Sequence, residues 1–597
     1  MMKRIYSFFT EVLMTVLNPS IHSSYNLKPV AVCASGLKFV PLHGQQLMLA
    51  VLFVLSGSLK ISAQPAPVKQ AAKSVFSLTT FSKGELKATS RGVFVSQNGD
   101  AVSPWTPFVG ADSAVVVDAE GHSYNVETMI GCNELYDVCK FHVNARTSGA
   151  KLSSQQLTVG TDVWALGYAV GKVVTKPLKV SRVEKFMEKY SYYVFKAVPA
   201  DNEQACPVAD KNGQVLGLWE KLSTSDTESY SADVRFPVSF EAGGLSINEP
   251  ALRQTGIRVQ LPSDRKSAYL ALMVSGQQST PRNYEAHIHD FISMFPDAVD
   301  GYSSLAQWQL SNNRLTDADA TMKEAMKKVP NKDEVHYEYS RLMMRQQIYA
   351  PDSTFTLWSL DKALEEAQEA YKLKPQPAYL HQQAQILYTK GDFKQALNLY
   401  TDLLKTDTRG SELYFEIAQC KTQLKAPQTE VLQALDSAVA LCPRPLTNIS
   451  APYFLARGSL LSEMKQYRNA LKDFNQYDTL MLGRATADFY EMRFKVEVEV
   501  RQYQQALNDI AHAIYLNPRE PVYLAEMASL ELRVSRFEDA VKTADLCLQL
   551  EPKSTDAYII KGLALIELKK KDEGIEALQK AQELGDARAE GYIKKYK

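Results

Sequence analysis

The sequence predicts a multidomain protein in which a β-rich segment precedes a stack of paired helices. Small residues recur at a fixed spacing in the C-terminal half, and short apolar runs of alternating period fill the middle of the chain. A chain of 597 residues is also too long for one hydrophobic core. We expect an N-terminal extension over residues 1–63, a β-domain over 74–275 and a helical array over 283–597.

Small residues in the C-terminal half lie 34 residues apart, at Ala506, Ala540 and Gly574. Two antiparallel helices pack closely where one of them presents Ala or Gly, so this spacing predicts one helix pair per 34 residues. Similar frames recur upstream from Tyr302, many of them ending in proline, which gives about eight copies. Because one helix pair cannot bury its apolar face alone, the copies are expected to stack.

The period, the paired-helix frame and the phased prolines resemble the tetratricopeptide repeat (TPR) family over residues 283–597. The resemblance implies an all-α superhelix that binds a protein or peptide on its concave face, which the first helix of each repeat lines. The inner-face positions of the family fall on His381, Gln385, Tyr388, Phe415, Gln419, Leu455, Ser459, Glu491, Lys495 and Ile559. This set lacks the Lys and Asn pattern of the repeats that bind chaperone C-termini.

Composition argues against several functional classes. Lys plus Arg and Asp plus Glu number 67 each, so no strong field favours nucleic acid or an anionic membrane. The seven Cys form no CxxC pair and the nine His are scattered, so we expect neither a metal nor a cofactor.

The N-terminal region predicts export. The apolar run over residues 47–55 is too short to span a bilayer, and it leads through small residues to an Ala63-Gln64 junction. This pattern resembles the signals of exported Bacteroidota proteins, and it predicts cleavage after Ala63 and a periplasmic or secreted protein without stable membrane insertion. Because the run begins late, either translation starts near Met48 or the leading segment is extended. The alternative is a buried strand or a short membrane anchor.

The segment between residues 74 and 275 carries short runs of period-two apolar residues punctuated by glycine, such as residues 92–96, 163–167 and 214–219. Short strands separated by polar turns are typical of an all-β barrel or sandwich. Their order resembles the Deg-like branch of the trypsin-like serine proteases, a double β-barrel fold. The resemblance rests on residues 90–100, 137–143, 159–168, 202–208 and 212–217. A helical stretch over 267–274 and a polar linker then lead to the repeats.

The catalytic residues of that family are missing from this framework. Thr106 stands at the histidine position and Gln204 at the serine position, while Asp137 stands at the aspartate position. A serine nucleophile needs an imidazole to take its proton, and the oxyanion needs donors from a glycine-rich loop. An aspartate without its imidazole has nothing to orient. The sequence therefore predicts a pseudoprotease.

Two alternatives involve cysteine. Cys206 lies two residues after the nucleophile position and would need His142 or His122 as its base. Alternatively, Cys132 or Cys139 would form a disulfide with Cys206 after export.

The hypothesis that follows is an exported, non-enzymatic scaffold that binds a protein or peptide partner. The rival hypotheses are an active or cysteine-type peptidase whose repeats recruit substrate, and a scaffold for envelope assembly.

Overall fold

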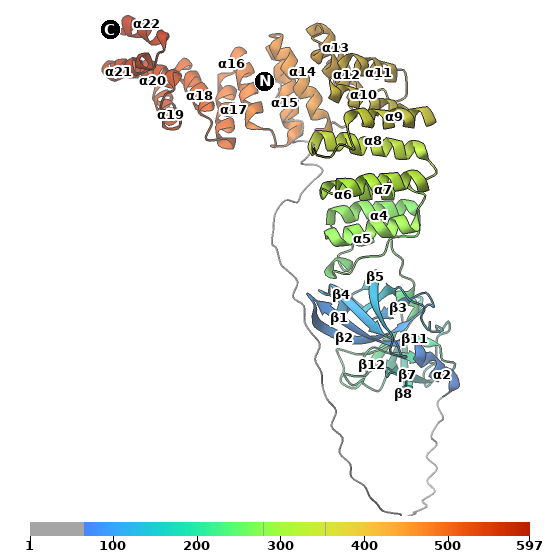
Figure 1. Cartoon of the computed structure of the whole chain (residues 1–597). Coiled ribbons are helices and arrows are strands. Elements are labelled where there is room, and N and C mark those ends of the chain that lie inside the picture. The colour runs from blue at the N-terminus through green and yellow to red at the C-terminus, as the bar shows by residue number, and fades with distance from the viewer. Residues whose placement is uncertain (1–64, 279, 353) are drawn as a thin grey trace, which may run out of the picture. The chain divides into compact units, whose positions relative to one another are not determined.

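The computed structural model describes residues 65–278, 280–352 and 354–597 (Figure 1). Residues Gln64–Lys597 form one compact unit. The predicted export signal, with its apolar run and its Ala63-Gln64 junction, lies outside the described residues. Within the described part of the chain, no helix combines the length and the apolar character needed to cross a membrane.

Six antiparallel strands close into a first barrel after a short helix α2 (Ala66–Ala71) and a single turn η1 (Ala72–Ser74). The strands follow one another around the barrel in the order β1-β2-β3-β6-β5-β4. Phenylalanine side chains fill its interior, with ring centroids 4.7 Å apart for Phe76 and Phe94. The strand bounds are β1 Val75–Ser82, β2 Glu85–Phe94, β3 Asp100–Ser103, β4 Ser113–Val117, β5 Ser123–Asn133 and β6 Val138–Val143.

A second barrel repeats this topology. Its strands follow the order β7-β8-β9-β12-β11-β10, which is the order of the first barrel when each is counted from its own first strand. Trp219 is fully buried and donates from Nε1 to Ser229 Oγ at 2.6 Å. The predicted trypsin-like double barrel is thus confirmed. The bounds are β7 Asp162–Gly167, β8 Val174–Phe186, β9 Tyr190–Phe195, β10 Cys206–Ala209, β11 Val215–Lys221 and β12 Ser229–Ala232.

The chain returns to the first barrel after β12. Val259 forms a parallel bridge with Met129 of β5, and the Met129 N–H donates to the Arg258 carbonyl at 2.9 Å. The elements along this return are α3 Arg235–Val238, η3 Ser246–Asn248 and η4 Leu252–Gln254.

Helices α4 (Arg265–Gln278) and α5 (Pro281–Met294) share a hydrophobic core with the first barrel. Phe291 of α5 is buried in the same cluster as Phe76 of β1. The predicted helical stretch over 267–274 lies within α4.

A buried histidine links these helices to the returning chain. The Nε2–H of His287 donates to the Val259 carbonyl at 2.8 Å, so Nδ1 accepts from the Ser275 hydroxyl at 2.7 Å. Burial lowers the pKa of His287, which agrees with a neutral ring between these two partners.

Eight helix pairs follow in sequence, and each helix packs on its neighbours along the chain (Figure 1). A final helix, α22 (Ala587–Tyr596), comes after the last pair. The pairs are α6 Val299–Ser311 with α7 Leu315–Lys328, α8 Lys332–Tyr349 with α9 Leu360–Leu373, α10 Pro377–Lys390 with α11 Phe393–Leu403, α12 Ser411–Gln423 with α13 Gln428–Ala440, α14 Ala451–Glu463 with α15 Tyr467–Met481, α16 Ala487–Glu499 with α17 Tyr503–Leu516, α18 Pro521–Arg533 with α19 Phe537–Leu550, and α20 Thr555–Glu567 with α21 Lys571–Glu583.

The small residues lie at the helix crossings, as the spacing predicts. Ala506 and Ala540 are fully buried. At the last pair, a Cβ atom added to Gly562 would lie 2.8 Å from the Gly574 carbonyl oxygen. The two backbones therefore touch at this crossing, and only a residue without a side chain fits.

Candidate functional site

The first catalytic position of the β-domain keeps the contact that a protease would make there, but with the wrong side chain. Thr106 opens the single turn η2 (Thr106–Phe108) after β3, and Asp137 precedes β6. Both the backbone N–H and the hydroxyl of Thr106 donate to Asp137 Oδ1, at 2.7 and 2.9 Å. A threonine hydroxyl held in this way has no basic nitrogen to offer a nucleophile.

Gln204 lies between β9 and β10, the place in the second barrel that matches Thr106 in the first. Its backbone N–H donates to the Ala200 carbonyl at 3.2 Å, and the Glu203 N–H donates to the same oxygen at 2.8 Å. The donor that would face an oxyanion is therefore already bonded inside its own loop.

The side chains of this loop are also paired. Lys176 contacts Glu203 at 2.6 Å, and Lys221 donates to Asp201 at 2.8 Å. The pKa of Asp201 is lowered by Lys221 and, to a smaller extent, by a hydrogen bond from Gln204. The glutamine amide is thus directed toward its own loop.

The cysteine alternative finds little support in the geometry. Cys206 is 2% exposed, and burial raises the pKa of its thiol to about 11, so the thiolate is scarce near neutral pH. The two candidate bases are engaged elsewhere: Nδ1 of His142 lies 3.0 Å from Asp100, and Nδ1 of His122 lies 3.1 Å from Asp118.

The proposed disulfide is not formed in the structure. Cys132, Cys139 and Cys206 are all free, and burial raises the pKa of Cys132 to about 12 and moves that of Cys139 in the same direction.

One buried acid near the catalytic positions was not predicted. Glu220 on β11 has an Oε1 atom that is buried and without a hydrogen-bond partner among the described residues. Burial, together with the charge of Asp137, raises the pKa of Glu220 to about 8. The strand pattern around Trp219 carries no signal that would distinguish this residue from an exposed glutamate.

Several of the predicted inner-face residues of the array join the first helices of consecutive pairs. His381 and Gln385 of α10 both contact Glu416 of α12, with nitrogen–oxygen distances of 2.6 and 3.0 Å. Although burial opposes it, the hydrogen bond and the charge of Glu416 raise the pKa of His381. Ser459 of α14 lies 3.4 Å from the Met492 sulfur on α16. We call the surface on which successive first helices meet the first-helix face.

Glu491 and Lys495 of α16 lie on the same first-helix face. Lys495 Nζ is 3.3 Å from an oxygen of Glu526 on α18 and also contacts Glu491. Neither Glu416 nor Glu526 was in the predicted set.

The remaining inner-face residues differ in exposure. Phe415 and Ile559 are buried, and the Phe415 ring lies 5.1 Å from that of Tyr453, so these two side chains pack within the array. Tyr388 packs on Phe393 with ring centroids 5.2 Å apart. Those that are half-buried are Tyr388, Gln419 and Leu455.

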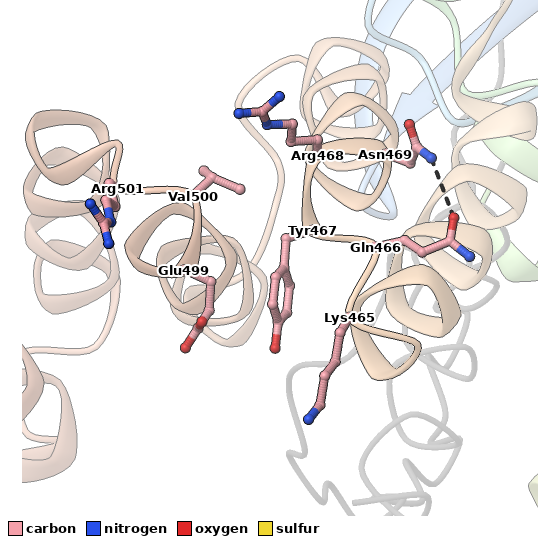
Figure 2. Close-up of a pocket in the computed structure, with 8 residues that line it drawn as sticks. All are labelled: Lys465, Gln466, Tyr467, Arg468, Asn469, Glu499, Val500 and Arg501. Atoms are coloured by element: carbon pink, nitrogen blue, oxygen red, sulfur yellow. Dashed lines mark hydrogen bonds between the residues drawn. The ribbon is translucent and has the colours of Figure 1, made fainter.

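An open hollow of about 630 Å³ lies at the helix ends, outside the predicted set (Figure 2). Figure 2 shows that Lys465 and Arg468 extend in opposite directions, so the positive side chains do not converge on one point. Its lining residues are Lys465, Gln466, Tyr467, Arg468, Asn469, Glu499, Val500 and Arg501.

Comparison with known families assigns the helical region. Residues 381–444 and 526–589 match the family described as Tetratricopeptide repeat. The helical array is built from tetratricopeptide repeats. A curated relative, the Hsp70-Hsp90 organizing protein of Triticum aestivum, is 22% identical over 222 residues, which cover 32% of this chain and 38% of that protein. The chain thus spans less than two fifths of that relative.

Solved structures resemble one region or the other. The TPR protein YrrB, described as having an unusual peptide-binding site, is 18% identical with a TM-score of 0.29, over 33% of this chain and 97% of its own. The HtrA-type protease AlgW with tripeptide is 17% identical with a TM-score of 0.25, over 29% and 60%. A serine endoprotease from Yersinia pestis is 14% identical with a TM-score of 0.26, over 31% and 65%. The fold assignment rests on the strand order and the repeat match.

Proposed function

We propose that this protein is an exported, non-enzymatic scaffold whose TPR array binds a protein or peptide partner. The observation that carries the proposal is the stack of eight helix pairs, whose first-helix face presents half-buried polar side chains. A stacked array of this kind offers an extended surface and no catalytic group of its own. We take the first-helix face to be the concave, partner-binding face.

The β-domain is proposed to be a catalytically inactive protease-like domain. Thr106 and Gln204 occupy the positions of the base and the nucleophile, and the Gln204 N–H is bonded to Ala200 within its own loop. Both replacements and the occupied donor support inactivity independently of one another.

Replacing His381 or Glu491 by alanine is expected to weaken capture of the partner without lowering the melting temperature. Surface changes usually alter the free energy of unfolding by less than about 0.5 kcal/mol, so lost capture would report binding. The measurement is affinity capture from the native cell envelope with mass spectrometry, beside a thermal melt. Glu538→Ala, an exposed change on the second helix α19, is the matched control. Capture that stays unchanged in both first-helix variants would reject this face as the binding surface.

Export is proposed to proceed with cleavage after Ala63. N-terminal sequencing of the exported protein is expected to begin at Gln64 or close to it, because the apolar run and the small-residue junction fit a signal peptidase site. An intact protein that stays in the cytoplasm would contradict this proposal.

A further inference from the structure

Two carboxylates and one ammonium group meet on the first-helix face between α16 and α18. Lys495 Nζ contacts Glu491 within α16 and lies 3.3 Å from Glu526 Oε1 across to α18. The Lys495 side chain is 54% exposed, whereas that of Glu526 is 24% exposed. We call Glu491, Lys495 and Glu526 the acidic seat.

The acidic seat has more acceptors than its own lysine can serve. Glu526 Oε2 is buried and has no hydrogen-bond partner among the described residues. Burial, only partly offset by Lys495, raises the pKa of Glu526, and Glu491 adds to the effect. A third carboxylate, Asp488, lies one turn away on α16 and accepts a hydrogen bond from Tyr523 at 2.8 Å. A buried acceptor without a donor is unfavourable, so the seat is incomplete as it stands.

The surface beside the acidic seat is open to a long side chain. One turn to either side of Glu526, α18 presents Val522 and Ser529, and both are exposed. Val522 offers an apolar contact to an aliphatic stem, while the small Ser529 side chain leaves room for a head group.

We propose that the acidic seat binds an arginine side chain of the partner, which displaces Lys495. A guanidinium carries five N–H donors in one plane and bonds a carboxylate through two of them, whereas an ammonium acts as a point charge. An arginine entering the seat therefore reaches both Glu526 oxygens and still faces Glu491. This inference rests on the proposed function, since it names the chemistry of the segment that the array binds.

Lys495 acts as an internal competitor in this arrangement. Its removal leaves two carboxylates facing the partner without a compensating charge. Lys495→Met, which keeps a long apolar stem, is therefore expected to strengthen binding of an arginine-containing segment. A lysine whose only role is to hold α16 against α18 would not give this result.

Fluorescence anisotropy on the full chain tests the proposal with three labelled dodecapeptides, (Arg-Ser)6, (Gln-Ser)6 and (Glu-Ser)6. We expect (Arg-Ser)6 to bind in preference to the other two. We expect Glu526→Gln to weaken that binding roughly tenfold, as is usual for a lost hydrogen bond between charged groups. Lys495→Met is expected to strengthen it several-fold, and Glu538→Gln on α19 to leave it unchanged.

Failure of this inference is distinguishable from failure of the proposed function. If (Arg-Ser)6 does not bind, or if Lys495→Met weakens its binding or leaves it unchanged, the arginine seat is wrong. Partner capture that still depends on His381 would then leave the proposed function standing. Thermal melts of the same variants exclude unfolding as the cause, and Lys495→Met tests the seat even where Glu526→Gln loosens the array.

Discussion

Fluorophosphonate probes are expected to leave the protein unlabelled, and hydrolysis of casein is expected to stay at background. These probes react with a serine made nucleophilic by an imidazole, whereas the structure places Gln204 and Thr106 at those positions. Gel-based labelling and a fluorescent casein assay measure the two outcomes. Turnover by the unaltered protein that disappears in Cys206→Ser would contradict this expectation in favour of a cysteine peptidase.

The double variant Thr106→His with Gln204→Ser is also expected to stay inactive. The new histidine would find Asp137 in place, but the N–H at position 204 donates to the Ala200 carbonyl at 3.2 Å. Loss of one oxyanion donor alone lowers kcat by roughly 100- to 1000-fold. Labelling of the double variant at the rate of a working serine protease would show that the loop rearranges readily, and would remove one of the two supports for inactivity.

Gly562→Ala is expected to destabilise the last repeats by about 1–3 kcal/mol, the usual cost of overpacking. The added Cβ would lie 2.8 Å from the Gly574 carbonyl oxygen and 2.8 Å from Leu578 Cγ. Because the first of these atoms belongs to the backbone of the facing helix, relief requires α20 and α21 to separate. Alanine is the better helix former by up to about 1 kcal/mol, so a net loss of stability reports the crossing itself.

Gly591→Ala in α22 is the matched control for this change. A Cβ at Gly591 meets no atom within 4 Å, so the same substitution is expected to be neutral or stabilising by up to about 1 kcal/mol. Hydrogen exchange over α20 and α21, together with thermal melts, separates the two variants. Equal effects of the two substitutions would show that the close crossing at Gly562 does not limit the packing.

The helical array was largely predictable because helix separation depends on residue size. Ala506 and Ala540 fix two crossings, and their spacing is visible in the sequence. The first helix of the second pair, α8, was not recognised. Its crossing residue is Ser340, a buried serine whose hydroxyl donates to the Ala363 carbonyl at 2.6 Å, so a satisfied polar residue takes the place of alanine there.

The candidate sites were only partly predictable. The contact between Thr106 and Asp137 follows from the order of the strands, but the bond from Gln204 to Ala200 depends on backbone angles that no motif specifies. On the array, the family positions identify the exposed face of one helix but not what the next repeat covers. Phe415 is buried for this reason, and Glu526 was missed because its partner lies 31 residues away.

The core shared by the first barrel, α4 and α5 gives the β-domain a role that needs no catalysis. Every open stack of helix pairs ends in an apolar surface, and repeat proteins protect that end with a specialised terminal unit. Here Phe291 is buried with barrel side chains, and His287 is bonded to the strand that returns along β5. The barrel thus serves as the N-terminal cap of the array. Selection for that capping surface would preserve a protease fold long after its nucleophile had been lost.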